Sequence, residues 1–221
     1  SHELRTPLTL ILNPLEEAAR DRQKDERIDV ALRNSRRMLR LVNQLLDFQK
    51  LSAGKKKFKL RPIDIVKFGR ICGDYFAAAC STKKIRFQTT LNGSPLTKET
   101  DAAFYVCGSL DALETIVFNF LSNALKYTPA EGSITLAIQQ TEQLVRLCVK
   151  DTGPGISEEG KQKLFQVFSQ VDSSTTRAFE GTGLGLALAK ELAEKMDGQV
   201  GAESEVGQGS TFWAEFPALT S

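Results

Sequence analysis

The sequence predicts an α+β protein in two parts: a helical hairpin, followed by an α/β sandwich in which helices cover a sheet. Apolar residues recur at helical spacings of three and four through roughly the first fifty residues. The remainder alternates between helical segments and short runs of strand-forming residues. With 221 residues, of which 41% are hydrophobic, the chain is long enough to bury a sizeable core.

The first part, residues 1–53, is predicted to be two antiparallel helices. One apolar seam runs along the first helix through Leu4, Leu8, Ile11, Leu15 and Ala18. The polar stretch at 20–27 predicts a turn, and a heptad-like apolar pattern continues from 28 to 49. A lone hairpin buries only part of its apolar surface. We therefore expect two copies to pair as a four-helix bundle, so that the protein is a homodimer.

Residues 54–62 are predicted to be a linker, because Gly54, a run of lysines and Pro62 interrupt the pattern. The second part, residues 63–221, is predicted to hold helices at 63–80, 111–127, near 157–166 and near 183–197. Predicted strands are 85–91, 103–107, 133–140, 143–150 and two closing strands, "QVGAES" and "STFWAEF". This mixture of helices and antiparallel strands predicts the sandwich.

The amino-acid composition argues against some classes of function. A net charge of +2 argues against a nucleic-acid binder, and we expect no nucleic-acid partner. The four cysteines form no C-x-x-C pair and lie mostly among apolar neighbours, which predicts buried, reduced thiols in the cytoplasm. No apolar run approaches the roughly 20 residues of a membrane span. We expect any membrane attachment to lie in parts of a parent protein outside this segment.

The single histidine, His2, lies beside Glu3 near the start of the first helix. Successive helical residues turn by about 100°, so His2 is predicted to lie roughly 200° from Leu4, away from the seam. Pro7 weakens the helix beside it. An isolated histidine is most often an ordinary residue. An exposed imidazole oriented by a carboxylate also suits a nucleophile, and both interpretations stay open on these residues alone.

Polar residues gather on one face of the predicted helix at 111–127. Asn119, Asn123 and Lys126 lie at positions i, i+4 and i+7. Asparagine disfavours helix interiors, so two asparagines on one face of a helix indicate a functional role. Amide oxygens are hard ligands for Mg²⁺, and a lysine adds positive charge for phosphate. The alternative is a solvated helix face.

Two glycine-rich stretches carry further candidates. In "VKDTGPGI" (149–156), Asp151 ends a predicted strand, where its carboxylate could accept a hydrogen bond from an exocyclic amine; an ordinary Asp-initiated turn is the alternative. In "GTGLGLALAKELAE" (181–194), glycines precede a helix whose N-terminus would attract an anion. The polar stretch at 168–180 predicts a lid, from which Arg177 could reach a phosphate.

The order of these stretches is similar to that of a known family. "HELRTP", "NFLSNALKYT", "DTGPGI", "LFQVFSQVD" and "GTGLGL" resemble the H, N, G1, F and G2 boxes of sensor histidine kinases. The resemblance covers nearly the whole chain, as a phosphotransfer hairpin followed by an ATP-binding domain. "SHELRTPLTLILNPLEE" is similar to hybrid two-component receptors.

The resemblance implies a kinase that uses ATP and Mg²⁺. His2 would accept the γ-phosphoryl group, with Glu3 as acid–base partner and Thr6 positioning water for dephosphorylation of a response regulator. Asn123 would hold Mg²⁺, with Asn119 and Lys126 near the phosphates, Tyr127 by the nucleotide and Asp151 on adenine. The remaining implied ATP-binding residues are Gly153, Gly155, Ile156, Arg177, Gly181, Thr182, Gly183, Leu184, Gly185, Leu186 and Thr211.

The implied partners are a second copy of the chain and the receiver domain of a response regulator, whose aspartate takes the phosphoryl group. One departure is Glu180, where the family often has glycine before the G2 box. Two alternatives stay open: another ATPase with a related pocket, and a degenerate kinase that acts as a dimeric scaffold.

Overall fold

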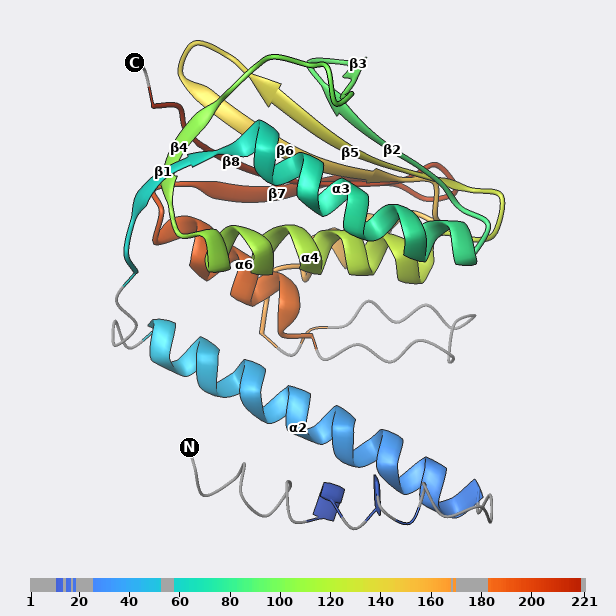
Figure 1. Ribbon diagram of the computed structural model, residues 1–221. Helices are drawn as coiled ribbons and strands as arrows, with labels where there is room; N and C mark the ends of the chain where they lie inside the picture. The colour runs from blue at the N-terminus through green and yellow to red at the C-terminus, as the bar shows by residue number, and fades with distance from the viewer. Residues whose placement is uncertain are drawn as a thin grey trace. The chain divides into compact units, whose positions relative to one another are not determined.

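The computed structural model describes residues 11–13, 15, 16, 18, 26–52, 58–167, 169 and 183–219. The chain divides into two compact units, residues 1–56 and 57–221 (Figure 1). Several predicted features lie outside the described residues: His2, Glu3, Thr6, Pro7, Arg177, Glu180, Gly181 and Thr182.

The first unit is helical. Helix α2 (Glu26–Ser52) is continuous, and residues 11–13, 15, 16 and 18 are helical as well. Arg36 on α2 forms an ion pair with Glu16, with 2.9 Å between Nη2 and Oε1. The two residues are equally distant in sequence from position 26, as expected of facing positions in an antiparallel hairpin. Leu32 and Leu46 of α2 are buried, which agrees with the heptad-like apolar pattern predicted at 28–49.

The second unit is a two-layer sandwich. Its main sheet has six strands in the order β3-β2-β5-β6-β8-β7. The strands are β2 (Arg86–Leu91), β3 (Ser94–Pro95), β5 (Ser133–Gln140), β6 (Leu144–Asp151), β7 (Gln199–Glu205) and β8 (Gly209–Pro217). Three helices lie on one side of this sheet (Figure 1): α3 (Ile65–Thr82), α4 (Leu110–Tyr127) and α6 (Gly185–Glu194).

The core lies between the sheet and these helices. Strand β6 buries alternate residues, Val145, Leu147 and Val149, because successive side chains point to opposite faces. Ile116 and Phe120 of helix α4 are fully buried and face these strand residues. The ring of Phe120 lies 5.8 Å from that of Phe212 on β8. Helix α4 is thereby fixed on the sheet by residues on the face next to its asparagines.

Besides β3, whose residues Ser94 and Pro95 lie between the predicted strands 85–91 and 103–107, four details differ from the sequence-based expectations. Strand β1 (Arg61–Asp64) was not predicted, and it pairs with β4 (Tyr105–Gly108) in a separate two-stranded sheet. Helix α3 therefore begins at Ile65, where the Asp64 carboxylate accepts hydrogen bonds from the backbone N–H groups of Val66 and Lys67. Strands β2 and β5 are parallel, since the connection between them contains α4 and returns the chain to the same end.

The fourth difference concerns α5 (Glu158–Lys161), which is much shorter than the helix predicted near 157–166. The Ser157 hydroxyl caps its start by accepting from the N–H of Gly160. A glycine inside so short a segment lowers its helix propensity, and residues 162–167 continue as turns and a bend.

Candidate functional site

Helix α4 carries the predicted polar stripe. Asn119, Asn123 and Lys126 are all half-buried. The Asn119 amide nitrogen donates to the Thr115 carbonyl over 2.7 Å, and this bond holds the side chain along the helix. Its Oδ1 lies against Gly185, the first residue of α6, where an added Cβ would collide with it. Asn119 and the N-terminus of α6 are therefore in contact, at what we call the Asn119 end of the site.

The start of α6 follows a glycine with φ +67°, Gly183, and the fully buried Leu184. Gly185 and Leu186 are half-buried in the first turn. The free N–H groups of a helix N-terminus, together with the helix dipole, favour an anion. These four residues, 183–186, are the described part of the predicted G2 stretch. They lie beside α4, the helix that carries Asn119 and Asn123.

Asp151 defines the opposite end, which we call the Asp151 end. It is the last residue of β6 and is 5% exposed. Burial raises the pKa of its carboxyl group, while hydrogen bonds from the backbone N–H groups of Gly153 and Ser210 oppose that rise. The Gly153 N–H bond is 2.8 Å long. A Cβ at Gly153 would also lie 3.1 Å from the carbonyl oxygen of Tyr127, so the C-terminus of α4 packs here.

Two glycine turns interlock beside Asp151. Gly155, at φ +71°, lies against the carbonyl of Glu205, and Gly209, at φ +91°, lies against the carbonyl of Asp151. The N–H of Gly207 donates to the Pro154 carbonyl over 2.7 Å. At Gly155 or Gly209, any side chain would collide with the neighbouring backbone and force it to move. The predicted Gly155 and Ile156 thus lie against Glu205 and Ser204 of β7.

The strand register shows how the predicted Thr211 and its neighbour Ser210 lie relative to Asp151. Strands β6 and β8 pair Asp151 with Ser210, and Lys150 with Thr211. Because side chains alternate across a strand, Thr211 lies on the opposite face of the sheet from Asp151. Ser210, 7% exposed, lies on the Asp151 face. The sequence held a signal for it, since the buried alternation Phe212, Ala214 and Phe216 leads back to Ser210.

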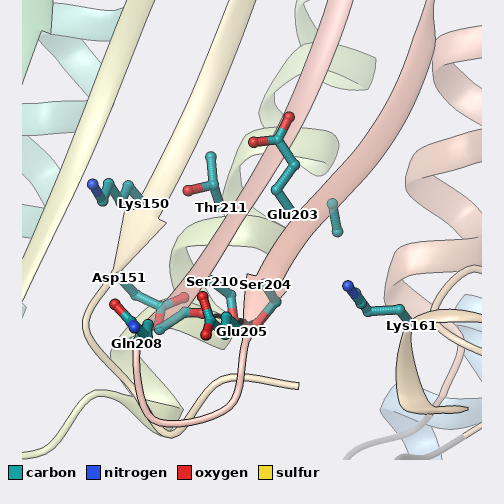
Figure 2. Close-up of a pocket in the computed structure, with 11 residues that line it drawn as sticks. Lys150, Asp151, Lys161, Glu203, Ser204, Glu205, Gln208, Ser210 and Thr211 are labelled. Carbon is teal, nitrogen blue, oxygen red and sulfur yellow. Dashed lines mark hydrogen bonds between the residues drawn. The ribbon is translucent and has the colours of Figure 1, made fainter. Parts of the chain in front are cut away.

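A cavity of about 490 Å³ opens at the Asp151 end (Figure 2). Asp151, Ser204 and Ser210 contribute to its lining from one face of the sheet, and the predicted Thr211 contributes with its neighbours Lys150 and Glu203 from the other face. Lys161 also lines the cavity. Asn119, Asn123 and Lys126 do not line this cavity. Asn119 lies further along α4, whose rise from Asn119 to Tyr127 is about 12 Å. The helix thus runs from one end of the site to the other.

Near Tyr127 the site contains a positively charged side chain, that of Lys126. Lys126 Nζ donates a hydrogen bond of 2.9 Å to the Tyr127 hydroxyl and lies 4.6 Å from the centre of its ring. Among the described residues there is no group of three or more histidine, cysteine, aspartate or glutamate side chains that could hold a metal ion. A divalent cation beside Asn123 would have to draw other ligands from substrate oxygens and water, as Mg²⁺ commonly does.

The sandwich, the buried carboxylate and the glycine-led helix define the class of ATPase shared by histidine kinases, DNA gyrase B and HSP90. Residues 108–220 match the family described as "Histidine kinase-, DNA gyrase B-, and HSP90-like ATPase", and residues 1–54 match the "His Kinase A (phospho-acceptor) domain". The chain belongs to the histidine kinases, since it carries both the phospho-acceptor domain and the ATPase domain.

Curated relatives agree with this assignment. WalK, a sensor histidine kinase of Bacillus subtilis, is 35% identical over 224 residues, which are 98% of this chain and 35% of WalK. Hybrid signal transduction histidine kinase D of Dictyostelium discoideum is 30% identical over 226 residues, 98% of this chain and 14% of that protein. LuxQ, an autoinducer 2 sensor kinase/phosphatase of Vibrio vulnificus, is 34% identical over 229 residues, 98% of this chain and 25% of LuxQ. The chain thus spans about a third or less of these relatives.

The fold is also that of a solved kinase. The crystal structure of full-length ShkA in complex with AMPPNP aligns with a TM-score of 0.80 and 31% identity, over 100% of this chain and 45% of ShkA. The fold is therefore a helical region followed by an α/β ATPase domain, as predicted. No helix in the described part of the chain is long and apolar enough to cross a membrane.

Proposed function

We propose that the protein transfers the γ-phosphoryl group of ATP to His2 and then to an aspartate of a response-regulator receiver domain. The observation that carries this proposal is the position of α4. Its Asn119 lies against the N-terminus of α6, and its Tyr127 carbonyl lies against Gly153 beside Asp151. One helix therefore connects an anion-binding end with an amine-binding end.

At the Asp151 end, the buried carboxylate would accept a hydrogen bond from the 6-amino group of adenine. Gly153 and Gly155 let the backbone come close to a flat ring. Tyr127, 40% exposed, offers a ring beside the same turn. This end would hold the base and orient the nucleotide along α4.

At the Asn119 end, Asn119 and the N-terminus of α6 would bind the phosphates. Lys126, which lies beside Tyr127 nearer the other end of the helix, would add positive charge for the phosphates from there. The Asn123 amide oxygen fits a single protein ligand of Mg²⁺, which when bound would neutralise phosphate charge. Arg177, Gly181 and Thr182, outside the described residues, are proposed to belong to the same end. Binding and positioning are most of what phosphoryl transfer requires of a protein.

The acceptor is proposed to be His2, on the other unit. An imidazole nitrogen attacks the γ-phosphorus, a P–N bond forms, the P–O bond to ADP breaks, and Glu3 takes the imidazole proton. Residues 1–53 and 63–221 act in this proposal as separate domains, joined by the predicted linker at 54–62, of which Arg61 and Pro62 are part of strand β1. Catalysis then depends on movement of one domain toward the other.

A homodimer is proposed to form through the hairpin. Ile11, Val30 and Met38 are 53%, 43% and 55% exposed in the single chain. Covering these side chains with a second hairpin would remove apolar surface from water. We propose a cytoplasmic location, with membrane attachment only through other parts of a parent protein.

Removal of the phosphoryl group from the regulator is a second proposed activity. LuxQ is named a kinase/phosphatase. Thr6, four residues after His2 in the sequence, would position the attacking water. A Thr6→Ala variant is expected to keep labelling of His2 while losing at least tenfold in the rate of regulator dephosphorylation.

Incubation with γ-³²P-labelled ATP and Mg²⁺ tests the kinase proposal. We expect a label that is labile in acid and stable in base, and that is absent from His2→Gln. Asn123→Ala should reduce the label by a factor of about 100 or more, because a phosphate-end ligand is lost. Label that persists in His2→Gln would show an acceptor other than His2. Hydrolysis of bound ATP without any label on the protein would indicate another ATPase, and failure to bind Mg-ATP would indicate a scaffold.

A further inference from the structure

Ser204 on β7 is a hydrogen-bonding centre that the proposed function has not used. It is half-buried and lies opposite Ser210 in the β7–β8 ladder, on the face that also carries Asp151. Three groups contact its hydroxyl oxygen: the backbone N–H of Ile156 at 2.8 Å, the Gly209 carbonyl at 2.8 Å and the Ser210 hydroxyl at 2.9 Å. Ser204 thereby joins the Gly153–Ile156 turn to β8.

The direction of these three bonds follows from counting protons. A serine hydroxyl has one proton to donate and two lone pairs that accept. The Gly209 carbonyl can only accept, so the Ser204 proton is donated to it. The Ile156 N–H can only donate, and it occupies one lone pair of Ser204. The remaining contact, with Ser210, therefore requires Ser210 to be the donor.

This assignment settles what Ser210 can offer to a ligand. Its single proton is held by Ser204, so only its lone pairs remain available. Asp151, when ionised, is also purely an acceptor. Both residues line the cavity at the Asp151 end (Figure 2). The pair therefore presents two acceptors and no donor from these side chains.

We infer that Ser204 determines nucleobase selectivity at this site, by making the Asp151–Ser210 pair a two-acceptor edge that takes a 6-amino purine and rejects a 6-oxo purine. An amino group has two protons for two acceptors. A 6-oxo group would place its own lone pairs against those of Ser210 and leave both unpaired, which is costly in a buried site. This inference rests on the proposed function, since it assumes that a purine nucleotide occupies the site.

Binding of ATP and ITP to the whole chain, measured by calorimetry, tests the inference. We expect the unaltered chain to bind ATP at least tenfold more tightly than ITP. Ser204→Ala frees the Ser210 proton to donate to a 6-oxo group, so the ATP-to-ITP affinity ratio should fall by about tenfold. Ser204→Thr, which keeps the hydroxyl, should restore it. Thr135→Ala, which removes a half-buried hydroxyl bonded to Gln88, is the matched control and should leave the ratio unchanged.

A second variant keeps the test decisive if Ser204→Ala does not fold. Ser210→Ala removes one acceptor but leaves Ser204 bonded to Ile156 and Gly209. It should weaken ATP binding severalfold and leave ITP binding within about twofold. An unchanged ATP-to-ITP affinity ratio in Ser204→Ala would overturn this inference but not the proposed function. So would a Ser210→Ala variant that loses more affinity for ITP than for ATP. Failure of the unaltered chain to bind ATP would overturn the proposed function, and this inference with it.

Discussion

Asp151 combines a stability cost with a binding role. Burial raises its pKa, so the folded chain holds the carboxyl proton more tightly than the unfolded chain. The stability from this group is fully present below the unfolded pKa of about 3.9, and it is lost as the pH rises through the raised folded pKa. At neutral pH the ionised carboxylate is therefore kept at the expense of folding stability.

Asp151→Asn is predicted to separate these two effects. At pH 7 its free energy of unfolding should equal or exceed that of the unaltered chain, because no buried charge is formed. Its affinity for ATP should fall by at least tenfold, since a charged acceptor is lost. Urea titration and calorimetry measure the two quantities. A variant that is less stable at pH 7 but binds ATP normally would contradict this assignment.

The four cysteines differ in reactivity for a reason that needed the structure. Burial raises the pKa of Cys72 to about 12 and that of Cys148 to about 11, and it also raises the pKa of Cys80. Cys107 is exposed, because it lies on the outer face of the β1–β4 pair. The expectation of buried thiols, drawn from apolar neighbours, holds for three residues and is wrong for Cys107.

Ellman's reagent at pH 8 should therefore modify one thiol at least tenfold faster than the other three, because the thiolate is the reactive form. Cys107→Ser should remove this fast phase and leave the slow phases unchanged. Two or more fast thiols in the native protein would show that the buried cysteines are accessible.

At the scale of elements, the two interlocking glycine turns hold the Asp151 end together. Gly155→Ala is predicted to weaken ATP binding by more than tenfold and to destabilise the fold, because its Cβ would strike the Glu205 backbone. Gly207→Ala is the matched control. It has a similar φ of +82°, but nothing lies within 4 Å of an added Cβ.

Gly207→Ala should therefore cost only about 1–2 kcal/mol, from the left-handed backbone, and should change ATP affinity by less than about twofold. Calorimetry and urea unfolding on both variants check the comparison. Equal losses of affinity would mean that the close approach at Gly155 has no special importance.

Elements with a strong local pattern were predictable. Helix α4, strand β5 and strand β6 appear within two residues of their predicted bounds, because each has a clear apolar period and turn residues at its ends. Strand β1 has four residues and gains its hydrogen bonds only from β4, far along the chain. No local pattern reveals a strand of that kind.

At the scale of the molecule, the two compact units divide the proposed chemistry. Residues 57–221 contain the sandwich core and the described part of the ATP site, whereas the proposed acceptor is in residues 1–56. We predict that residues 57–221 expressed alone fold and bind ATP within about threefold of the whole chain, since the core and its ligands are intact.

That fragment should acquire no acid-labile label by itself, and addition of residues 1–56 should allow label to appear on the added fragment. Label on the isolated 57–221 fragment would show an acceptor other than His2. Loss of ATP binding by a folded fragment would show that the first unit contributes to the nucleotide site.

The sequence by itself determined the two-part α+β architecture and the family, and it predicted the candidate residues, because apolar periods and short polar motifs are local properties of the chain. The tertiary structure decided which of those residues meet. Strand register placed Ser210 rather than Thr211 beside Asp151, and the β7–β8 ladder brought Ser204 to the same face. Register depends on pairing between strands distant in sequence, and a shift of one residue reverses every side chain, so no single segment could specify it.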